Sequence, residues 1–122
     1  MMSTTLTVVS GDAYAGDDEN DRRLLVTVAN DGLPVDLTGT ELVFMVKLHI
    51  EDADEDALIS TTAELADPQT GDTEGHAFIT LEESDTAGLA GIYHWELQGE
   101  DTVGAVTLAS GRFKVVRDLI GT

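Results

Sequence analysis

Alternation of apolar and polar residues at every second position is the feature that most constrains the fold of this chain. Apolar side chains occupy positions 24, 26 and 28, and the pattern repeats at positions 42, 44, 46, 48 and 50. Successive residues of a β-strand point to opposite faces, so this spacing is typical of strands with one buried face. No stretch has the i, i+3, i+4, i+7 spacing of an amphipathic helix. The sequence therefore predicts an all-β chain.

Clusters of Gly, Asp, Asn and Pro divide the chain into about seven such strands. We place them near residues 6–9, 23–28, 41–50, 58–65, 77–81, 91–98 and 107–117. About seven short strands in roughly 100 residues are typical of an immunoglobulin-like sandwich of two antiparallel sheets. Residues 85–93 also have the form of a tyrosine corner, in which the hydroxyl of Tyr93 bonds back to the backbone. The residues predicted to be buried between the sheets are Leu24, Val26, Phe44, Val46, Ile79, Tyr93, Trp95, Leu97, Phe113 and Val115.

Length and composition limit the number of domains and the kinds of site that this chain can contain. With 122 residues, of which 42% are apolar, it fits a single domain spanning residues 1–122 with its own core. The absence of cysteine excludes disulfides, thiolate zinc sites and cysteine nucleophiles. The chain has neither a long apolar run nor the basic and apolar parts of a signal peptide at its start, so we expect no membrane contact.

A strong excess of acidic residues limits the partners of this protein. Asp and Glu total 24 against 6 Lys and Arg, which gives a net charge of −18, and the acids are spread through the loops. We therefore expect no nucleic-acid partner. Repulsion within such a surface is screened over about 10 Å at 0.1 M salt but over only about 3 Å at 1 M. The composition is typical of proteins from halophilic organisms; an acidic mesophilic protein is the alternative.

Four segments resemble a known family. They are DGLPVDLTG at residues 31–39, LVFMVK at 42–47, GIYHWEL at 91–97 and SGRFKV at 110–115. Together they resemble the N-terminal domain of the baseplate upper protein of tailed phages and the small immunoglobulin-like virion proteins similar to it, over roughly residues 6–118. The resemblance implies a structural virion module, assembled in the host cytoplasm, that contacts other virion proteins and copies of itself. It brings no catalytic residues.

The acidic loops contain the only candidates for a metal site. A calcium loop of EF-hand type counted from Asp52 would need Gly at its sixth and Glu at its twelfth position, where this chain has Ala57 and Ala63. The EF-hand interpretation therefore fails. A looser site for a hard cation competes with the alternative of a solvated acidic loop. Its weak candidates are Asp17, Asp18, Asp52, Asp54 and Asp56.

Motifs for catalysis are missing from the sequence. The serines lack a nucleophile elbow, the glycines fall at turns and not in a phosphate-binding loop, and His49, His76 and His94 lack the spacing of a metal triad. We expect no enzyme activity, no cofactor and no small-molecule substrate. Tyr93 and Trp95 could form a sugar-stacking pair, but their spacing of two on one strand favours the core. A capsid decoration protein and an adhesion or carbohydrate-binding module remain alternative functions.

One predicted sheet face differs from the rest of this acidic chain. In an immunoglobulin topology the strands at 41–50, 91–98 and 107–117 share a sheet, whose outer face then has few acids apart from Glu41 and Glu96. Depletion of acids with retained apolar and basic groups is typical of a contact surface. The alternative is that the chain's own end, such as Leu119 and Ile120, covers this face. The predicted interface residues are Val43, Met45, Lys47, Ile92, His94, Arg112, Lys114 and Val116.

Overall fold

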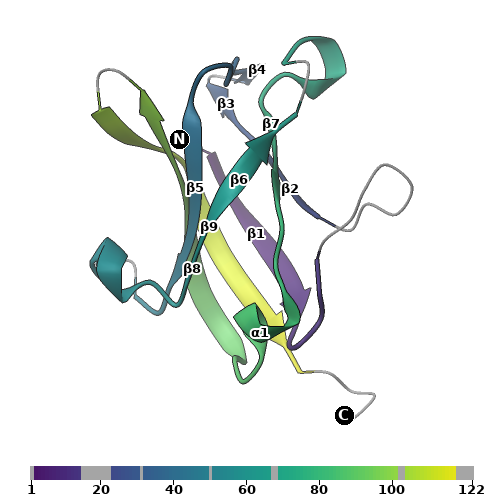
Figure 1. The fold of residues 1–122 in the computed structure, drawn as a ribbon, viewed down its shortest axis with the longest axis vertical. Helices are drawn as coiled ribbons and strands as arrows, with labels where there is room; N and C mark the ends of the chain where they lie inside the picture. The colour runs from purple at the N-terminus through teal and green to yellow at the C-terminus, as the bar shows by residue number, and fades with distance from the viewer. Residues whose placement is uncertain are drawn as a thin grey trace.

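The computed structural model describes residues 2–14, 23–30, 32–49, 51–66, 69–101 and 104–117. Strands dominate these residues (Figure 1). The helical segments among them are two 3-10 turns, η1 (Asp54–Asp56) and η2 (Gly71–Thr73), and one short helix, α1 (Glu83–Thr86). The strands are β1 (Met2–Val9), β2 (Leu24–Thr27), β3 (Ala29–Asn30), β4 (Leu33–Pro34), β5 (Glu41–Lys47), β6 (Ile59–Leu65), β7 (His76–Ile79), β8 (Gly91–Asp101) and β9 (Gly104–Val116).

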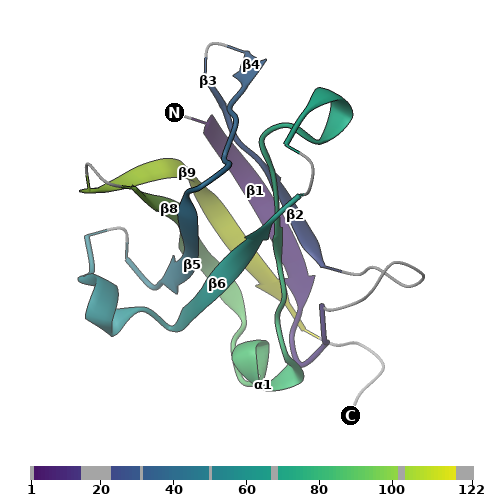
Figure 2. The same ribbon diagram turned by 45° about the horizontal axis from the view of Figure 1, so that its top comes forward.

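Seven strands follow one another in the order β1-β9-β8-β5-β6-β7-β2, and β3 and β4 form a separate small hairpin (Figure 2). Strand β6 belongs to both halves of this arrangement. It pairs with β5 from Ile59 to Ala63 and with β7 at Glu64 and Leu65. The strands on either side of β6 therefore form two layers, and the prediction of an all-β, sandwich-like fold is confirmed.

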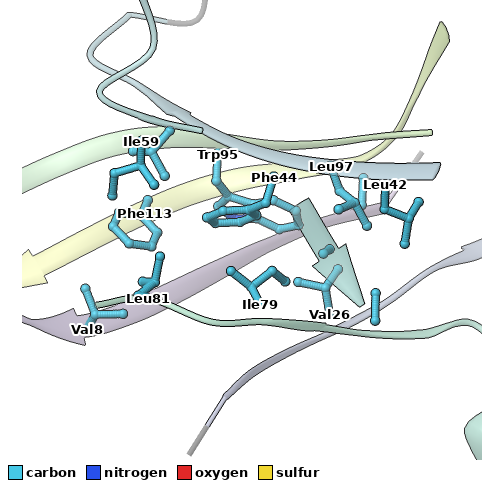
Figure 3. Close-up of a cluster of buried hydrophobic side chains, with 14 of the residues drawn as sticks. Val8, Val26, Leu42, Phe44, Ile59, Ile79, Leu81, Trp95, Leu97 and Phe113 are labelled. Carbon is cyan, nitrogen blue, oxygen red and sulfur yellow. The ribbon is translucent and has the colours of Figure 1, made fainter. Parts of the chain in front are cut away.

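The space between the layers is filled by the predicted core. Trp95, Phe44 and Phe113 lie at its centre, with the Phe44 ring centroid 5.9 Å from Trp95 and 6.1 Å from Phe113. Figure 3 shows these rings on one side of the core, facing Val26 and Ile79 from the other layer. Of the ten predicted core residues, nine are buried and Leu24 is half-buried against the cluster. Period-two patterning thus placed nine of these ten side chains correctly, although Leu48 of the same pattern is exposed and Met45 of the outer face is buried.

The strand ends and one pairing differ from the sequence prediction. β5 ends at Lys47, three residues earlier than predicted, because the chain turns there and the His49 N–H donates to the Asp52 carboxylate at 3.1 Å. β8 and β9 are longer than predicted, and they meet in a long hairpin. β1 runs parallel to β9. The prediction that all strands pair antiparallel is therefore wrong for this pair.

The predicted tyrosine corner is present in the structure, and a second turn precedes β5. The hydroxyl of Tyr93 donates to the Ala90 carbonyl at 3.0 Å, as expected for a tyrosine corner. Between β4 and β5, the hydroxyl and the amide of Thr38 donate to Asp36 Oδ1 at 2.6 and 3.0 Å. Both bonds stabilise the ionised form of the Asp36 carboxyl and hold its pKa below the ordinary value. The bond from the Thr38 hydroxyl has the larger effect, and the bond from the Thr38 amide the smaller.

Candidate partner interface

All eight predicted interface residues lie on the outer face of one sheet. Across β5, β8 and β9 the register aligns Lys47 with His94 and His94 with Arg112, and the next row aligns Ile92 with Lys114. Residues paired across strands share a face, and the face alternates along each strand. The buried residues Val46, Trp95 and Phe113 occupy the opposite face. Ile92, Arg112 and Lys114 are exposed, Val43, His94 and Val116 are half-buried, and Met45 and Lys47 are buried.

Lys47, one of the predicted interface residues, pairs with a carboxylate of its own chain. Its side chain is only 5% exposed, and its ammonium lies 3.2 Å from Glu96 Oε1 on the neighbouring strand β8. Gln98 Nε2 donates to the other oxygen of the same carboxylate at 3.3 Å. A charged amine can be buried at an acceptable cost only when an opposite charge accompanies it, and Glu96 supplies that charge. Lys47 therefore joins β5 to β8 within the chain.

Strand β1 adds residues that the sequence analysis missed. Its parallel pairing with β9 places Thr5 beside Arg112 and Thr7 beside Lys114. Both threonines are exposed on the same outer face. No sequence signal could have found them, because strand order is a non-local property. We call the resulting surface the cationic patch, made of Thr5, Thr7, Ile92, His94, Arg112 and Lys114.

The charges on this face are separated along the strands. Within the described residues, Arg112 and Lys114 have no carboxylate at ion-pair distance, whereas Arg23 pairs with Glu64 at 3.0 Å. The acids Glu41 and Glu100 lie opposite each other where β5 begins, at the far end of the face from Lys47, His94 and Arg112. The cationic patch is thus an exposed, positively charged area on a chain of net charge −18.

Of the loop candidates for a metal ion, Asp52 has a side-chain contact within the chain, and the side chain of Asp54 lies outside the description. Asp17 and Asp18 lie outside the described residues. The Asp52 carboxylate accepts the His49 amide, and the Asp56 amide donates to the Ala53 carbonyl within the turn around η1. In the part of the chain that the structure describes, no three His, Asp or Glu side chains gather as they would around a metal ion. The end of the chain, including Leu119 and Ile120, also lies outside that part.

A concavity of about 400 Å³ lies at the end of the sandwich where β1 and β9 finish. It is lined by Ser10, Gly11, the segment 87–90 and Arg117, and Arg117 is the ionisable side chain in this lining. The nearby Thr86 is fully buried, with its hydroxyl accepting the Gly11 amide at 2.9 Å. Among the described residues of this lining there is no acid–base pair of side chains.

The aromatic residues do not form a sugar-binding platform. Tyr93 is 8% and Trp95 1% exposed, so neither ring can stack on a ligand at the surface. Exposed aromatic side chains are what a carbohydrate site of this kind requires.

Among the helices of the described chain, none has the length and apolar character needed to cross a membrane.

Comparison with known protein families is consistent with this structural picture. The family model of the BppU N-terminal domain matches residues 10–74, which is a little over half of the 122-residue chain. This segment runs from the end of β1 through β6 to η2, so it includes one of the strands that carry the outer face. No curated protein matches the sequence. The chain belongs to the family of the BppU N-terminal domain, that of the baseplate upper protein, and is a phage baseplate-related structural protein.

Proposed function

We propose that this protein is a non-enzymatic building block of a tailed virus, which docks on neighbouring acidic subunits through its cationic patch. The observation that carries the proposal is the exposure of Arg112 and Lys114, without carboxylate partners in the described chain, on a protein of net charge −18. Family membership supports a structural and non-enzymatic role. The neighbouring subunit belongs to the baseplate, tail, neck or capsid surface.

The composition of the patch suits a protein contact. Ile92 is 55% exposed and lies directly across from Lys114, so an apolar side chain and a cation stand side by side. Interfaces commonly combine apolar contacts with arginine, while lysine at the rim steers an acidic partner. Thr5 and Thr7 add short hydroxyl side chains that leave the long cations accessible. An acidic partner surface is therefore the best match.

The host of this virus is, on this proposal, a halophile. Self-repulsion in a chain of net charge −18 is screened over about 3 Å at 1 M salt, against about 10 Å at 0.1 M. Molar salt also weakens contacts that rest on charge alone. The apolar component from Ile92 then keeps the docking contact effective, since burial of apolar surface does not depend on charge.

Quantitative counting of the protein in purified particles tests the docking proposal. Arg112→Gln with Lys114→Gln removes two positive charges from the patch. The matched control, Ala53→Glu with Ser84→Glu, changes the net charge by the same amount at exposed positions outside the sheet. We expect the patch variant to lose incorporation by about tenfold or more, and the control to incorporate normally.

Two results would contradict the docking proposal. Normal incorporation of the patch variant would place the docking surface elsewhere. Equal losses in the patch variant and the control would show that total charge, and not the cationic patch, governs assembly. Thermal melting of both isolated variants, expected within about 0.5 kcal/mol of the parent, separates docking from folding.

A further inference from the structure

The first strand of this protein is an edge without charge. β1 is the terminal strand of the sheet and is paired on one side only, with β9 (Figure 1). Its eight residues, Met2–Val9, include no Asp, Glu, Lys or Arg, although the chain has 30 such residues in total. An exposed edge of this length is a template for the addition of another strand.

Backbone geometry defines which groups of β1 face outward. Ser10 N–H donates to the Val116 carbonyl at 2.8 Å, so alternate residues from Ser10 backward direct their backbone groups to β9. The residues between them, Val9, Thr7 and Thr5, direct theirs to the other side. Val9 N–H donates to the Tyr14 hydroxyl at 2.7 Å, which closes that end of the edge. At Thr5 and Thr7 none of the described strands pairs with the outward backbone groups.

The two edges of the sheet differ in their protection. Natural edge strands are protected by shortness, charged side chains, proline or bulges. The opposite edge strand, β2, has four residues, and Arg23 immediately before it pairs with Glu64. β1 is twice as long, regular in its pairing, and free of charge and proline. Within the described residues, β1 is the edge strand that lacks these forms of protection, and this indicates that its edge is used.

We infer that β1 pairs edge to edge with β1 of a second copy of this chain, antiparallel and across a twofold axis. Two chains of net charge −18 repel wherever their acids approach, so a stable contact needs a segment that is uncharged in both. β1 satisfies this condition when it pairs with β1 of a second copy, because a twofold contact uses the same surface on both chains. Pairing centred on Leu6 places Thr5 opposite Thr7 of the second copy, and such cross-strand threonine pairs are favourable.

This dimer would join the two cationic patches into one surface. Arg112 and Lys114 lie on β9, one strand in from the edge, so the paired β1 strands separate the cations of the two copies. Thr5 and Thr7 of one copy then lie beside Thr5 and Thr7 of the second copy. The pairing does not rest on the docking function, although a continuous patch would allow both copies to contact one acidic partner.

Sedimentation equilibrium of the full chain in about 2 M NaCl tests the pairing, because that salt concentration screens the acidic surface. The parent protein is expected to be a dimer. Thr7→Pro removes an outward N–H and leaves the ladder to β9 intact, so it should be monomeric with an unchanged strand signal in circular dichroism. Thr7→Val keeps the N–H and should remain a dimer.

A second variant protects the test against misfolding of the proline variant. Thr5→Lys retains the backbone and adds the charge that natural edges use against strand addition, so it should also be monomeric. A monomeric parent, or a dimer with the same dissociation constant in Thr7→Pro and Thr5→Lys, would overturn the inference. Arg112→Gln with Lys114→Gln should dimerise normally, which separates this pairing from the docking function.

Discussion

At the residue scale, the Gln69 side chain forms hydrogen bonds to several separate parts of the chain. It is 6% exposed and lies in the connection between β6 and β7. Its Oε1 accepts the amides of Leu37 and Gly75 at 3.2 and 3.0 Å, and its Nε2 donates to the carbonyls of Ala66 and His76 at 2.8 and 3.0 Å. This side chain is the partner of the Leu37 and Gly75 amides and the Ala66 carbonyl, whereas the His76 carbonyl also accepts the Ala66 amide at 3.0 Å.

Replacement of Gln69 by leucine should destabilise the protein strongly. The side chain volume is similar, but the Leu37 and Gly75 amides and the Ala66 carbonyl lose their partner, and each buried unsatisfied group costs about 1–3 kcal/mol. Water can reach part of this loop, so we expect a total loss of about 3 kcal/mol. Chemical denaturation in high salt measures it, with the exposed neighbour Thr70→Ala as control. A loss below about 1 kcal/mol would show that the loop satisfies these groups by rearrangement.

At the scale of elements, the ion pair between Lys47 and Glu96 links the two central strands of the sheet. Lys47 stands at the end of β5, and Glu96 stands in the middle of β8, with exposed fractions of 5% and 15% for the two side chains. A buried pair adds little stability compared with apolar residues of the same size, but loss of one partner leaves a buried charge. Its contribution here is to the register between β5 and β8.

Removal of one partner should therefore cost more than removal of both. Glu96→Gln removes the Glu96 carboxylate from beside the Lys47 ammonium, and we expect a loss of about 3 kcal/mol, at the low end of the range for buried pairs because Glu96 is partly exposed. Lys47→Met combined with Glu96→Gln should recover most of it. Glu41→Gln, an exposed acid on the same face of β5, is the control. Equal losses in the single and double variants would contradict this explanation.

At the scale of the whole molecule, surface charge determines the conditions for stability. The chain carries a net charge of −18, and folding brings its acids closer together than they are in the unfolded chain. The resulting repulsion lowers the free energy of unfolding at low ionic strength. Salt that shortens the screening length from about 10 Å to about 3 Å removes most of this effect.

We therefore expect the melting temperature to rise steeply with salt. Thermal unfolding of the isolated protein in about 0.1 M and about 2 M NaCl measures the effect, since the two solutions differ mainly in screening. Sodium sulfate at equal ionic strength should raise the midpoint further, because sulfate is excluded from apolar surface. An unchanged midpoint between the two NaCl solutions would remove the argument for a halophilic host.

The local pattern of the sequence was enough to predict the centre of the core. Trp95, Phe44 and Phe113 were placed in the core from alternation alone, and the structure confirms each of them. Side chain direction in a strand depends only on position along that strand, so it can be read without knowing the neighbours. The resemblance to the baseplate family also rested on short local segments, and the family match confirms it.

Properties that depend on the partner of each strand could be found only in the tertiary structure. Lys47 and Glu96 are 49 residues apart, and Gln69 and Leu37 are 32 apart, so neither contact leaves a trace in a local pattern. The parallel placement of β1 beside β9 likewise decides which residues surround Arg112 and Lys114. The sequence by itself determined the core, the family and the charge of this protein. Strand order, which arises from packing between distant segments, decided which of the predicted interface residues are exposed and which edge of the sheet is open.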